Sequence, residues 1–290
     1  MPNNCQIVLA VGATGPFAGL ATAALISRGI KVRALVRNQA KAEVLRQQGV
    51  DEIALGDLRD LASLEHAAQG VDGVFHIGPA FLADEAQLGL NMVGAAQRAG
   101  VRRFVFSSVI QPTSARLSNH ASKIPVEDAV FASGMEYVVL QPANFFQNIG
   151  KAWNSVIQKS VFDEPFPKNA RVGRVDYRDV AEVVGVAFAD DRLNYGTFEL
   201  CAGMMNREEI VAVMSEVLGR KIEAAEPNFE EWAAAAGIPA GDEQRQGMKN
   251  VFDYYAHSPL GGNGLTLRTI LQREPTNLRQ YFESLEHRPI

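Results

Sequence analysis

The residues with the clearest chemical potential lie in Ile7–Gly19, which reads I-V-L-A-V-G-A-T-G-P-F-A-G. An apolar strand leads into a glycine-rich turn, and the turn leads into the first turn of a helix. Gly12 suits a tight turn that a Cβ would obstruct, and Gly15 allows the backbone to approach a phosphate closely. Pro16 suits the first helical position, because its missing N–H has no partner within the helix. This order of elements predicts a site for a dinucleotide pyrophosphate.

The helix that follows the turn completes this motif. We expect the backbone amides of Phe17 and Ala18 to point toward the anion at the positive end of the helix dipole. Ala18 takes the third glycine position, where helix and strand pack closely. The residues of the motif that we expect to contact a cofactor are Gly12, Thr14, Gly15, Pro16, Phe17 and Ala18.

The end of the second predicted strand, Lys31–Val36, indicates which dinucleotide binds. An Asp or Glu there usually binds the ribose 2′-hydroxyl of NAD, and this chain has Arg37 instead. A guanidinium can grip a 2′-phosphate with two hydrogen bonds, and Arg33 and Lys41 are near in sequence. We therefore favour NADP(H) over NAD(H), with a solvated surface arginine as the alternative for Arg37. Asp57, after the third strand, either accepts a hydrogen bond from the adenine amino group or caps a helix.

Strands and helices alternate along the first half of the chain. This alternation predicts an α/β fold of Rossmann type, with a doubly wound parallel sheet covered on both faces. The strands are apolar nearly throughout, as strands buried on both faces should be. Ser118 is a plausible N-cap for the last helix. The predicted strands after the first are Lys31–Val36, Asp51–Leu55, Gly73–Ile77, Arg103–Ser107 and Glu136–Leu140, and the helices between them are Gln39–Gln48, Leu61–Ala68, Glu85–Ala99 and Asn119–Ser133.

The alternation ends after Pro142. We predict a Rossmann domain at 1–150, to which 171–203 returns, and a smaller C-terminal substrate-binding lobe made of 151–170 and 204–290. Within this lobe, Phe162–Ala170 is expected to be a loop. Five aromatic residues near the start of the lobe suit either a flat apolar or aromatic ligand or ordinary packing. They are Phe145, Phe146, Trp153, Phe162 and Phe166.

Composition narrows the classes of protein and partner. The 290 residues are 47% hydrophobic, which is enough for a sizeable core, and the net charge is −5. The Lys and Arg residues are scattered, which argues against nucleic acid and against an anionic membrane surface. Cys5 and Cys201 are expected to be buried thiols, and no metal-like His spacing is present. Without a signal peptide or a run of about 18 apolar residues, we expect a cytoplasmic protein.

Nine short motifs occur in a fixed order along the chain: G-A-T-G at 12–15, A-L-V-R at 34–37, G-D-L at 56–58, A-G-V-R-R-F-V-F-S-S at 99–108, H-A-S-K-I-P-V-E at 120–127, Q-P-A-N-F-F-Q-N at 141–148, V-D-Y-R-D-V-A at 175–181, G-R-K at 219–221 and R-E-P-T at 273–276. With these motifs the chain resembles the NmrA-like family, an atypical branch of the short-chain dehydrogenase/reductase superfamily. The resemblance implies a Rossmann fold, a small C-terminal substrate domain, NADP(H) across the first strand ends, and a monomer or homodimer. The further cofactor contacts that we expect are Leu58, Gly78, Pro79, Ser107, Lys123, Pro142, Asn144 and Phe145.

The chain departs from the superfamily where catalysis is expected. Typical members use a Tyr-x-x-x-Lys pair together with a Ser or Thr, and the Tyr donates a proton to the substrate. Lys123 matches the lysine, but Asn119 stands four residues before it and cannot protonate anything. By this count Val109 falls at the expected serine position, and with a shift of one residue Ser108 would occupy it. Ser107 directly precedes these two residues.

Two residues are left as candidates for catalysis. Lys123 can bind the ribose hydroxyls or stabilise charge on a reduced substrate, or it can form a surface salt bridge with Glu127. His120 can donate a proton, or it can be a surface histidine at a helix start. The favoured function is an NADP(H)-dependent oxidoreductase that transfers hydride to a small quinone-like or aromatic acceptor. The alternative is a non-catalytic NADP(H) redox sensor that acts through a protein partner.

Overall fold

The computed structural model describes residues 5–240 and 242–286, which form two compact units. The first unit contains the chain up to Ala115 together with Asn119–Gln141 and Val180–Phe198. The second contains Arg116–Ser118, Pro142–Asp179 and the chain from Glu199 onward. The segment that returns to the first unit lies inside the predicted range 171–203. That the second unit binds substrate stays a prediction.

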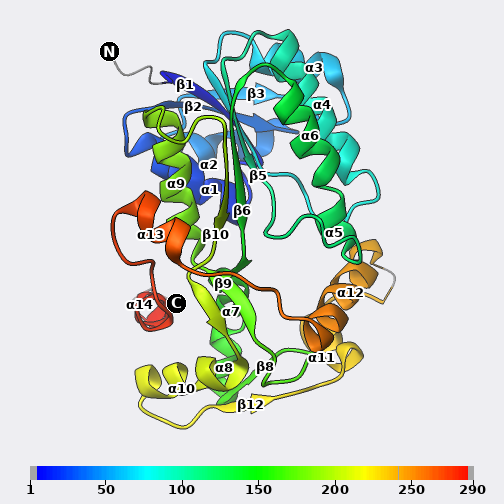
Figure 1. Cartoon of the computed structure of the whole chain (residues 1–290), viewed down its shortest axis with the longest axis vertical. Helices are drawn as coiled ribbons and strands as arrows, with labels where there is room; N and C mark the ends of the chain where they lie inside the picture. Colours follow the sequence, from blue (N-terminus) through cyan, green and yellow to red (C-terminus); the bar gives the residue numbers. More distant parts are fainter. Residues whose placement is uncertain (1–4, 241, 287–290) are drawn as a thin grey trace. The chain divides into compact units, whose positions relative to one another are not determined.

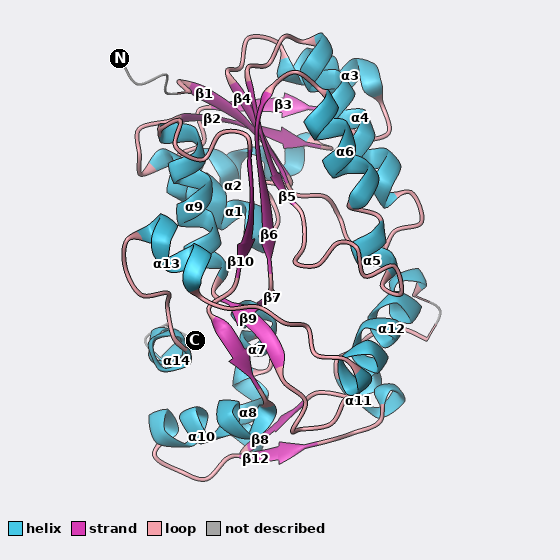
Figure 2. Ribbon diagram, viewed as in Figure 1, coloured by secondary structure: helices cyan, strands magenta, loops and turns pink. Residues whose placement is uncertain are grey.

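The first unit is built on a seven-stranded sheet with the order β10-β6-β5-β4-β1-β2-β3 (Figure 2). The pairs from β3 through β6 are all parallel. The predicted strands are present within one or two residues of their expected ends, and the doubly wound α/β fold is confirmed. The strands are β1 (Ile7–Val11), β2 (Lys31–Val36), β3 (Glu52–Leu55), β4 (Gly73–His76), β5 (Arg103–Ser107), β6 (Glu136–Pro142) and β10 (Gly196–Leu200).

Helices cover both faces of this sheet (Figure 1). One face carries α1 (Pro16–Ile26), α2 (Ala42–Gln47) and α9 (Tyr177–Ala189), and a short 3-10 helix, Gln39–Lys41, precedes α2. The other face carries α3 (Leu61–Ala68), α4 (Glu85–Arg98) and α6 (Ile124–Ala132). Buried aliphatic and aromatic side chains of the strands and of α3, α4 and α6 form one continuous core, which includes Leu9, Leu64, Val74, Met92, Phe104, Phe106 and Val130.

The strand order contains a reversal between β1 and β4. From β1 the chain builds outward through β2 and β3, then crosses back to place β4, β5 and β6 on the other side. The connections that leave the carboxyl ends of β1 and β4 therefore go to opposite faces of the sheet. A crevice forms at such a point, and α/β proteins of this kind bind ligands there.

The predicted helix Asn119–Ser133 is wrong in one respect, because it is two helices. The first, α5, is Ser118–Ala121, and α6 begins at Ile124. Pro125 lies in the first turn of α6, and within one continuous helix its ring would clash with the carbonyl four residues earlier. Lys123 thereby becomes the N-cap residue of α6. Ser118 is the first residue of α5 rather than its N-cap.

The second unit has two small sheets and a mostly helical remainder. One sheet has the order β11-β9-β7, and the other pairs β12 with β8. The expected loop Phe162–Ala170 is wrong at its start, because Val161–Asp163 is a strand; runs of two to four residues are too short to reveal a period. The elements are β7 (Asn144–Phe145), β8 (Val161–Asp163), β9 (Val172–Val175), β11 (Gly203–Met205), β12 (Glu223–Ala225), α7 (Phe146–Gly150), α8 (Trp153–Lys159), α10 (Arg207–Leu218), α11 (Phe229–Ala235), α12 (Glu243–His257), α13 (Leu265–Leu271) and α14 (Leu278–Glu286).

Within the described residues, every helix is too short or too polar to cross a bilayer.

Close packing of α4 against α6 depends on a glycine, and this generates a prediction. A Cβ on Gly89 would lie 2.5 Å from Val126 Cγ2, whereas a Cβ on Gly94 would meet only the flexible end of Arg98 at 3.3 Å. We expect Gly89→Ala to lower the free energy of unfolding by about 1–3 kcal/mol through overpacking. Gly94→Ala, the control in the same helix, should raise it by about 0.5–1 kcal/mol. Urea denaturation measures both, and equal effects would contradict this packing.

Candidate functional site

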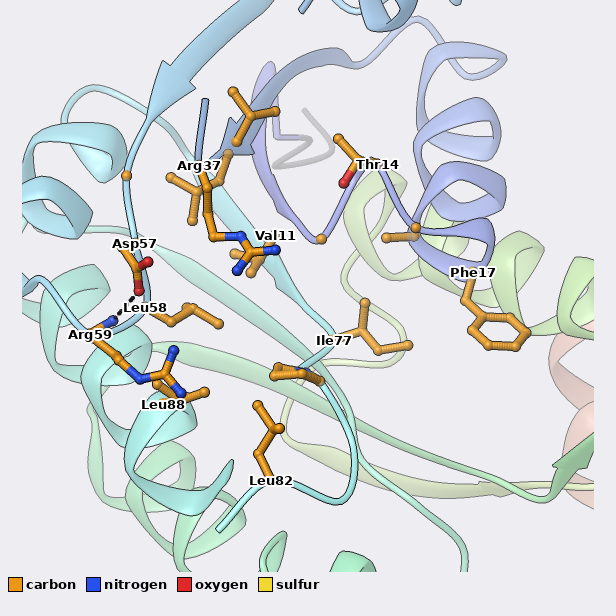
Figure 3. A pocket seen from close by; sticks show the side chains of 18 of the residues that line it. Val11, Thr14, Phe17, Arg37, Asp57, Leu58, Arg59, Ile77, Leu82 and Leu88 are labelled. Carbon is orange, nitrogen blue, oxygen red and sulfur yellow. Dashed lines mark hydrogen bonds between the residues drawn. The ribbon is translucent and has the colours of Figure 1, made fainter. Parts of the chain in front are cut away.

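A cavity of about 460 Å³ lies where the carboxyl ends of β1, β2, β3 and β4 come together (Figure 3). Its walls are the turn after β1, the end of β2, the turn after β3 and the loop between β4 and α4. It therefore occupies the crevice that the strand order creates. The lining residues are Val11, Gly12, Thr14, Gly15, Pro16, Phe17, Ala18, Leu35, Val36, Arg37, Gly56, Asp57, Leu58, Arg59, Ile77, Gly78, Pro79, Leu82 and Leu88.

The turn after β1 has the geometry that its glycines predicted. Gly12 has a φ of +78°, and a Cβ there would lie 3.3 Å from the Ile77 carbonyl oxygen. The Gly15 amide donates to the Gly12 carbonyl at 2.7 Å, which closes the turn. Helix α1 then begins at Pro16, and within the described chain no side chain caps it and no acidic residue stands in its first turn. The positive end of this helix is thus left to an anionic ligand.

Arg37 is the basic residue that the structure brings to the cavity. Its side chain is exposed and extends beside Val11 (Figure 3). Among the described residues, none forms a hydrogen bond or ion pair with its guanidinium. Arg33 is engaged elsewhere, because it pairs with Glu52 at 2.7 Å and donates to two carbonyls near the end of α3. The side chain of Lys41 lies outside the described part of the structure.

The turn after β3 supplies Asp57 and a residue that the sequence reasoning missed. Asp57 Oδ1 accepts from the Arg59 amide at 2.8 Å, while Asp60 caps α3. The helix-capping alternative for Asp57 is therefore wrong. The Arg59 guanidinium makes two hydrogen bonds with the Asp84 carboxylate, at 2.8 and 3.1 Å. Arg59 could have been found from its place directly after the Gly-Asp-Leu segment at the strand end.

Most of the predicted cofactor contacts meet in this one cavity. Ser107 and Lys123 belong to the same unit but do not line the cavity, and Pro142, Asn144 and Phe145 belong to the second unit. Their roles, like those of the cavity residues, stay predictions. The predicted residues that do line it are Gly12, Thr14, Gly15, Pro16, Phe17, Ala18, Arg37, Asp57, Leu58, Gly78 and Pro79.

Lys123 is buried and paired, but not with the residue that its spacing suggested. Its Nζ lies 2.6 Å from Glu85 Oε1, and both side chains are almost completely buried. Ser122 Oγ donates to the same carboxylate oxygen at 2.8 Å. The surface salt bridge between Lys123 and Glu127 is therefore wrong.

Glu127 instead anchors the end of β5 to the end of β6. Its carboxylate accepts from Ser108 Oγ at 2.5 Å and from Gln141 Nε2 at 2.9 Å, and all three side chains are buried. The Ser108 hydroxyl is therefore committed to a structural hydrogen bond. Ser107, the last residue of β5, is also buried, and Val109 follows these two serines.

Two buried histidines lie close to Lys123. His120 lies with Nδ1 3.2 Å from the Gln111 carbonyl oxygen, and burial, with a further effect from Lys123, lowers its pKa. The surface alternative for His120 is therefore wrong. His76 ends β4, and burial together with the Lys123 charge lowers its pKa to about 3. Both imidazoles are neutral at pH 7.

The second unit surrounds Asn144 and Phe145 with polar and aromatic groups. The Asn144 amide donates to the Tyr255 hydroxyl at 3.3 Å, and the Phe145 ring packs edge-on against Tyr177. Burial raises the pKa of Tyr255. Phe146, Trp153 and Phe162 belong to the core of this unit, so ordinary packing accounts for these three residues.

Both cysteines lie in the interior of the protein. Cys5 and Cys201 are buried as expected, and burial raises the pKa of Cys5 to about 11 and also raises that of Cys201. Over residues 5–240 and 242–286, no three His, Cys, Asp or Glu residues are grouped as a metal site would require.

Known proteins resemble this chain over most of its length. The model of the NmrA-like family matches residues 4–282. NAD(P)H azoreductase from Xenophilus azovorans is 30% identical over 226 residues, which cover 74% of this chain and 75% of the relative. Quinone oxidoreductase 2 from Escherichia coli is 25% identical over 244 residues, covering 81% and 84%. The structure of Citrobacter sp. triphenylmethane reductase complexed with NADP(H) superposes with a TM-score of 0.84 at 21% identity, covering 97% and 99%, which shows a shared fold.

The depressed pKa of His76 generates a pH prediction. A histidine in the unfolded chain has a pKa near 6.5, whereas the pKa of His76 in the folded protein is about 3. Between these two pH values the unfolded chain therefore binds a proton that the folded protein does not bind. Stability is therefore lost as the pH falls from 6.5 toward 3. The unfolding free energy should fall between pH 7 and pH 5, and we expect this fall to be about 2 kcal/mol smaller in His76→Phe than in the wild type. Urea denaturation at both pH values tests this, with the exposed His66→Phe as control; identical declines in wild type and His76→Phe would contradict it.

Proposed function

The chain belongs to the NmrA-like family, and we propose that it is an NADP(H)-dependent oxidoreductase that passes hydride to a small quinone-like or aromatic acceptor. The observation that carries the proposal is the single cavity that gathers the glycine turn, the N-terminus of α1 and Arg37. Relatives that are named as an NAD(P)H azoreductase and a quinone oxidoreductase support the same reaction class. A neighbouring fold with NADP(H) bound supports the cofactor.

The residues of the cavity fit a dinucleotide phosphate. A Cβ on Gly12 would lie 3.3 Å from the Ile77 carbonyl oxygen, and one on Gly15 would lie 3.2 Å from the Gly12 carbonyl oxygen, so the turn that lines the cavity is compact. Within the described chain, no side chain caps the start of α1 beside it. We assign the pyrophosphate to this helix terminus. We assign the 2′-phosphate to Arg37, whose guanidinium is not engaged by another described group, and the adenine end to Asp57 and Leu58.

The remaining predicted contacts act on the nicotinamide end in this proposal. A bound NADPH supplies the hydride. The Lys123 ammonium donates one hydrogen bond to Glu85, and its remaining N–H groups can donate to a ribose hydroxyl. Because this lysine and Glu85 together carry no net charge, they orient the cofactor rather than attract an anion. Ser107, Pro142, Asn144 and Phe145 complete the expected contacts.

The polar groups near Lys123 suit an acceptor that needs little acid catalysis. Asn119 replaces the usual tyrosine, and His120 is neutral at pH 7 with Nδ1 facing a carbonyl. A quinone gains two electrons and one hydrogen as hydride, and a second proton from water completes the hydroquinone. A ketone would need an acid such as the tyrosine that Asn119 replaces. The relatives named for azo, quinone and triphenylmethane substrates also suggest conjugated acceptors.

The deciding experiment follows NADPH oxidation by the purified protein against a panel of quinones, azo dyes and aromatic carbonyls, with NADH in parallel. Steady oxidation of NADPH by a quinone or dye is the expected result. Tight NADPH binding without oxidation by any acceptor would contradict the reductase and favour the redox sensor.

Arg37 gives the sharpest variant. We expect Arg37→Ala to raise the KM for NADPH about 10- to 100-fold and to leave that for NADH unchanged, because only NADPH carries the 2′-phosphate. Arg33→Ala is the matched control, since that arginine is bound to Glu52 and to carbonyls of the chain. Equal losses with both cofactors would argue against a 2′-phosphate contact.

A further inference from the structure

Glu85, the first residue of α4, joins two separate parts of the first unit through one carboxylate. Its Oε1 accepts from Lys123 Nζ at 2.6 Å and from Ser122 Oγ at 2.8 Å, at the junction between α5 and α6. Its Oε2 accepts from the Phe81 amide at 2.8 Å, in the loop between β4 and α4. The side chain of Glu85 is only 3% exposed and that of Lys123 only 10%. The carboxylate therefore couples the lysine to this loop in a largely dry environment.

The loop that Glu85 holds is part of the cavity wall. Gly78, Pro79 and Leu82 line the cavity. Phe81 directly precedes Leu82 in the same loop. Phe81 has a φ of +65°, a left-handed conformation that a residue with a bulky side chain adopts at a cost. The hydrogen bond from its amide to Glu85 offsets part of that cost, so the loop conformation depends on the carboxylate.

Glu85 also occupies the first turn of α4. A carboxylate in the first turn of a helix interacts favourably with the helix dipole, and the three hydrogen-bond donors satisfy both oxygens. The positive charge of Lys123 is compensated locally, as a buried ammonium requires. Removing the carboxylate would leave that ammonium unpaired and free the loop in a single step.

We propose that Glu85 is a positioning residue of the dinucleotide site: it sets the direction of the Lys123 ammonium and the conformation of the loop Gly78–Asp84. The inference rests on the proposed function, since it assumes that this site binds NADP(H). It differs from the contribution of Arg37, because the loop and the lysine serve the parts that NADPH and NADH share. Loss of Glu85 should therefore weaken binding of both cofactors by the same factor.

The test measures the Kd of NADPH and NADH by fluorescence titration, together with the Tm, for Glu85→Gln, Lys123→Met and the double variant. Glu85→Gln should lower the Tm and raise both Kd values at least 10-fold. The double variant removes both buried charges, so its Tm should recover toward wild type while its Kd values stay raised. Glu65→Gln, which breaks an exposed ion pair between α3 and Arg98 of α4, is the control and should change each Kd less than twofold.

Two results would overturn the positioning role. One is a folded Glu85→Gln protein whose NADPH Kd is within twofold of wild type, and the other is a double variant that recovers affinity together with stability. If Glu85→Gln does not fold, the double variant is compared with Lys123→Met, and equal Kd values in these two variants would overturn the role of Glu85. If the wild-type protein binds NADPH but reduces no acceptor, the reductase proposal is wrong. The role of Glu85 is then still tested by the Kd values of its variants. Wild-type protein that binds neither cofactor would overturn both.

Discussion

The close approach of two chain segments beneath the cavity constrains the rest of the first unit. The turn after β1 passes the end of β4 so closely that a Cβ on Gly12 would lie 3.3 Å from the Ile77 carbonyl oxygen. Gly12 has a φ of +78°, a conformation that residues with a side chain rarely adopt, and it lies where the chain passes from β1, paired with β4, into α1. The strand order creates the crevice, and this contact holds two of its walls, the turn after β1 and the loop after β4, close together. A residue with a side chain would be strained here and would push the Ile77 carbonyl away from the turn.

The parts of the site that could be predicted from sequence are those encoded within a few neighbouring residues. The glycine turn, Pro16 at the start of α1 and Arg37 after β2 lie at fixed offsets from strand ends, and the parallel sheet brings those ends to one edge. The doubly wound parallel sheet was also predictable, because apolar runs alternate with helical segments. Each of these inferences needs only local spacing and the rule that parallel strands end together.

What could not be predicted depends on partners far apart in the chain. Lys123 and Glu127 have the spacing of a surface pair, yet each binds a different buried group, and the partner of Lys123 lies 38 residues earlier. Sequence spacing does not reveal burial, and burial selects the partner that can satisfy the charge. The left-handed Phe81 was equally hidden, since no glycine or asparagine marks that position. The break before Pro125 was visible in sequence, but its consequence for Lys123 was not.

Arg37 and Glu85 illustrate two different degrees of integration into the fold. Glu85 is held by three donors and holds two segments, so its replacement disturbs folding and ligand binding together. Arg37 is exposed and, among the described residues, has no partner to lose. In evolution, cofactor preference at the end of β2 can therefore drift without a penalty in stability, while the neighbouring loop is held almost fixed. Divergence within such a lineage would change which dinucleotide is used sooner than it changes how the dinucleotide is held.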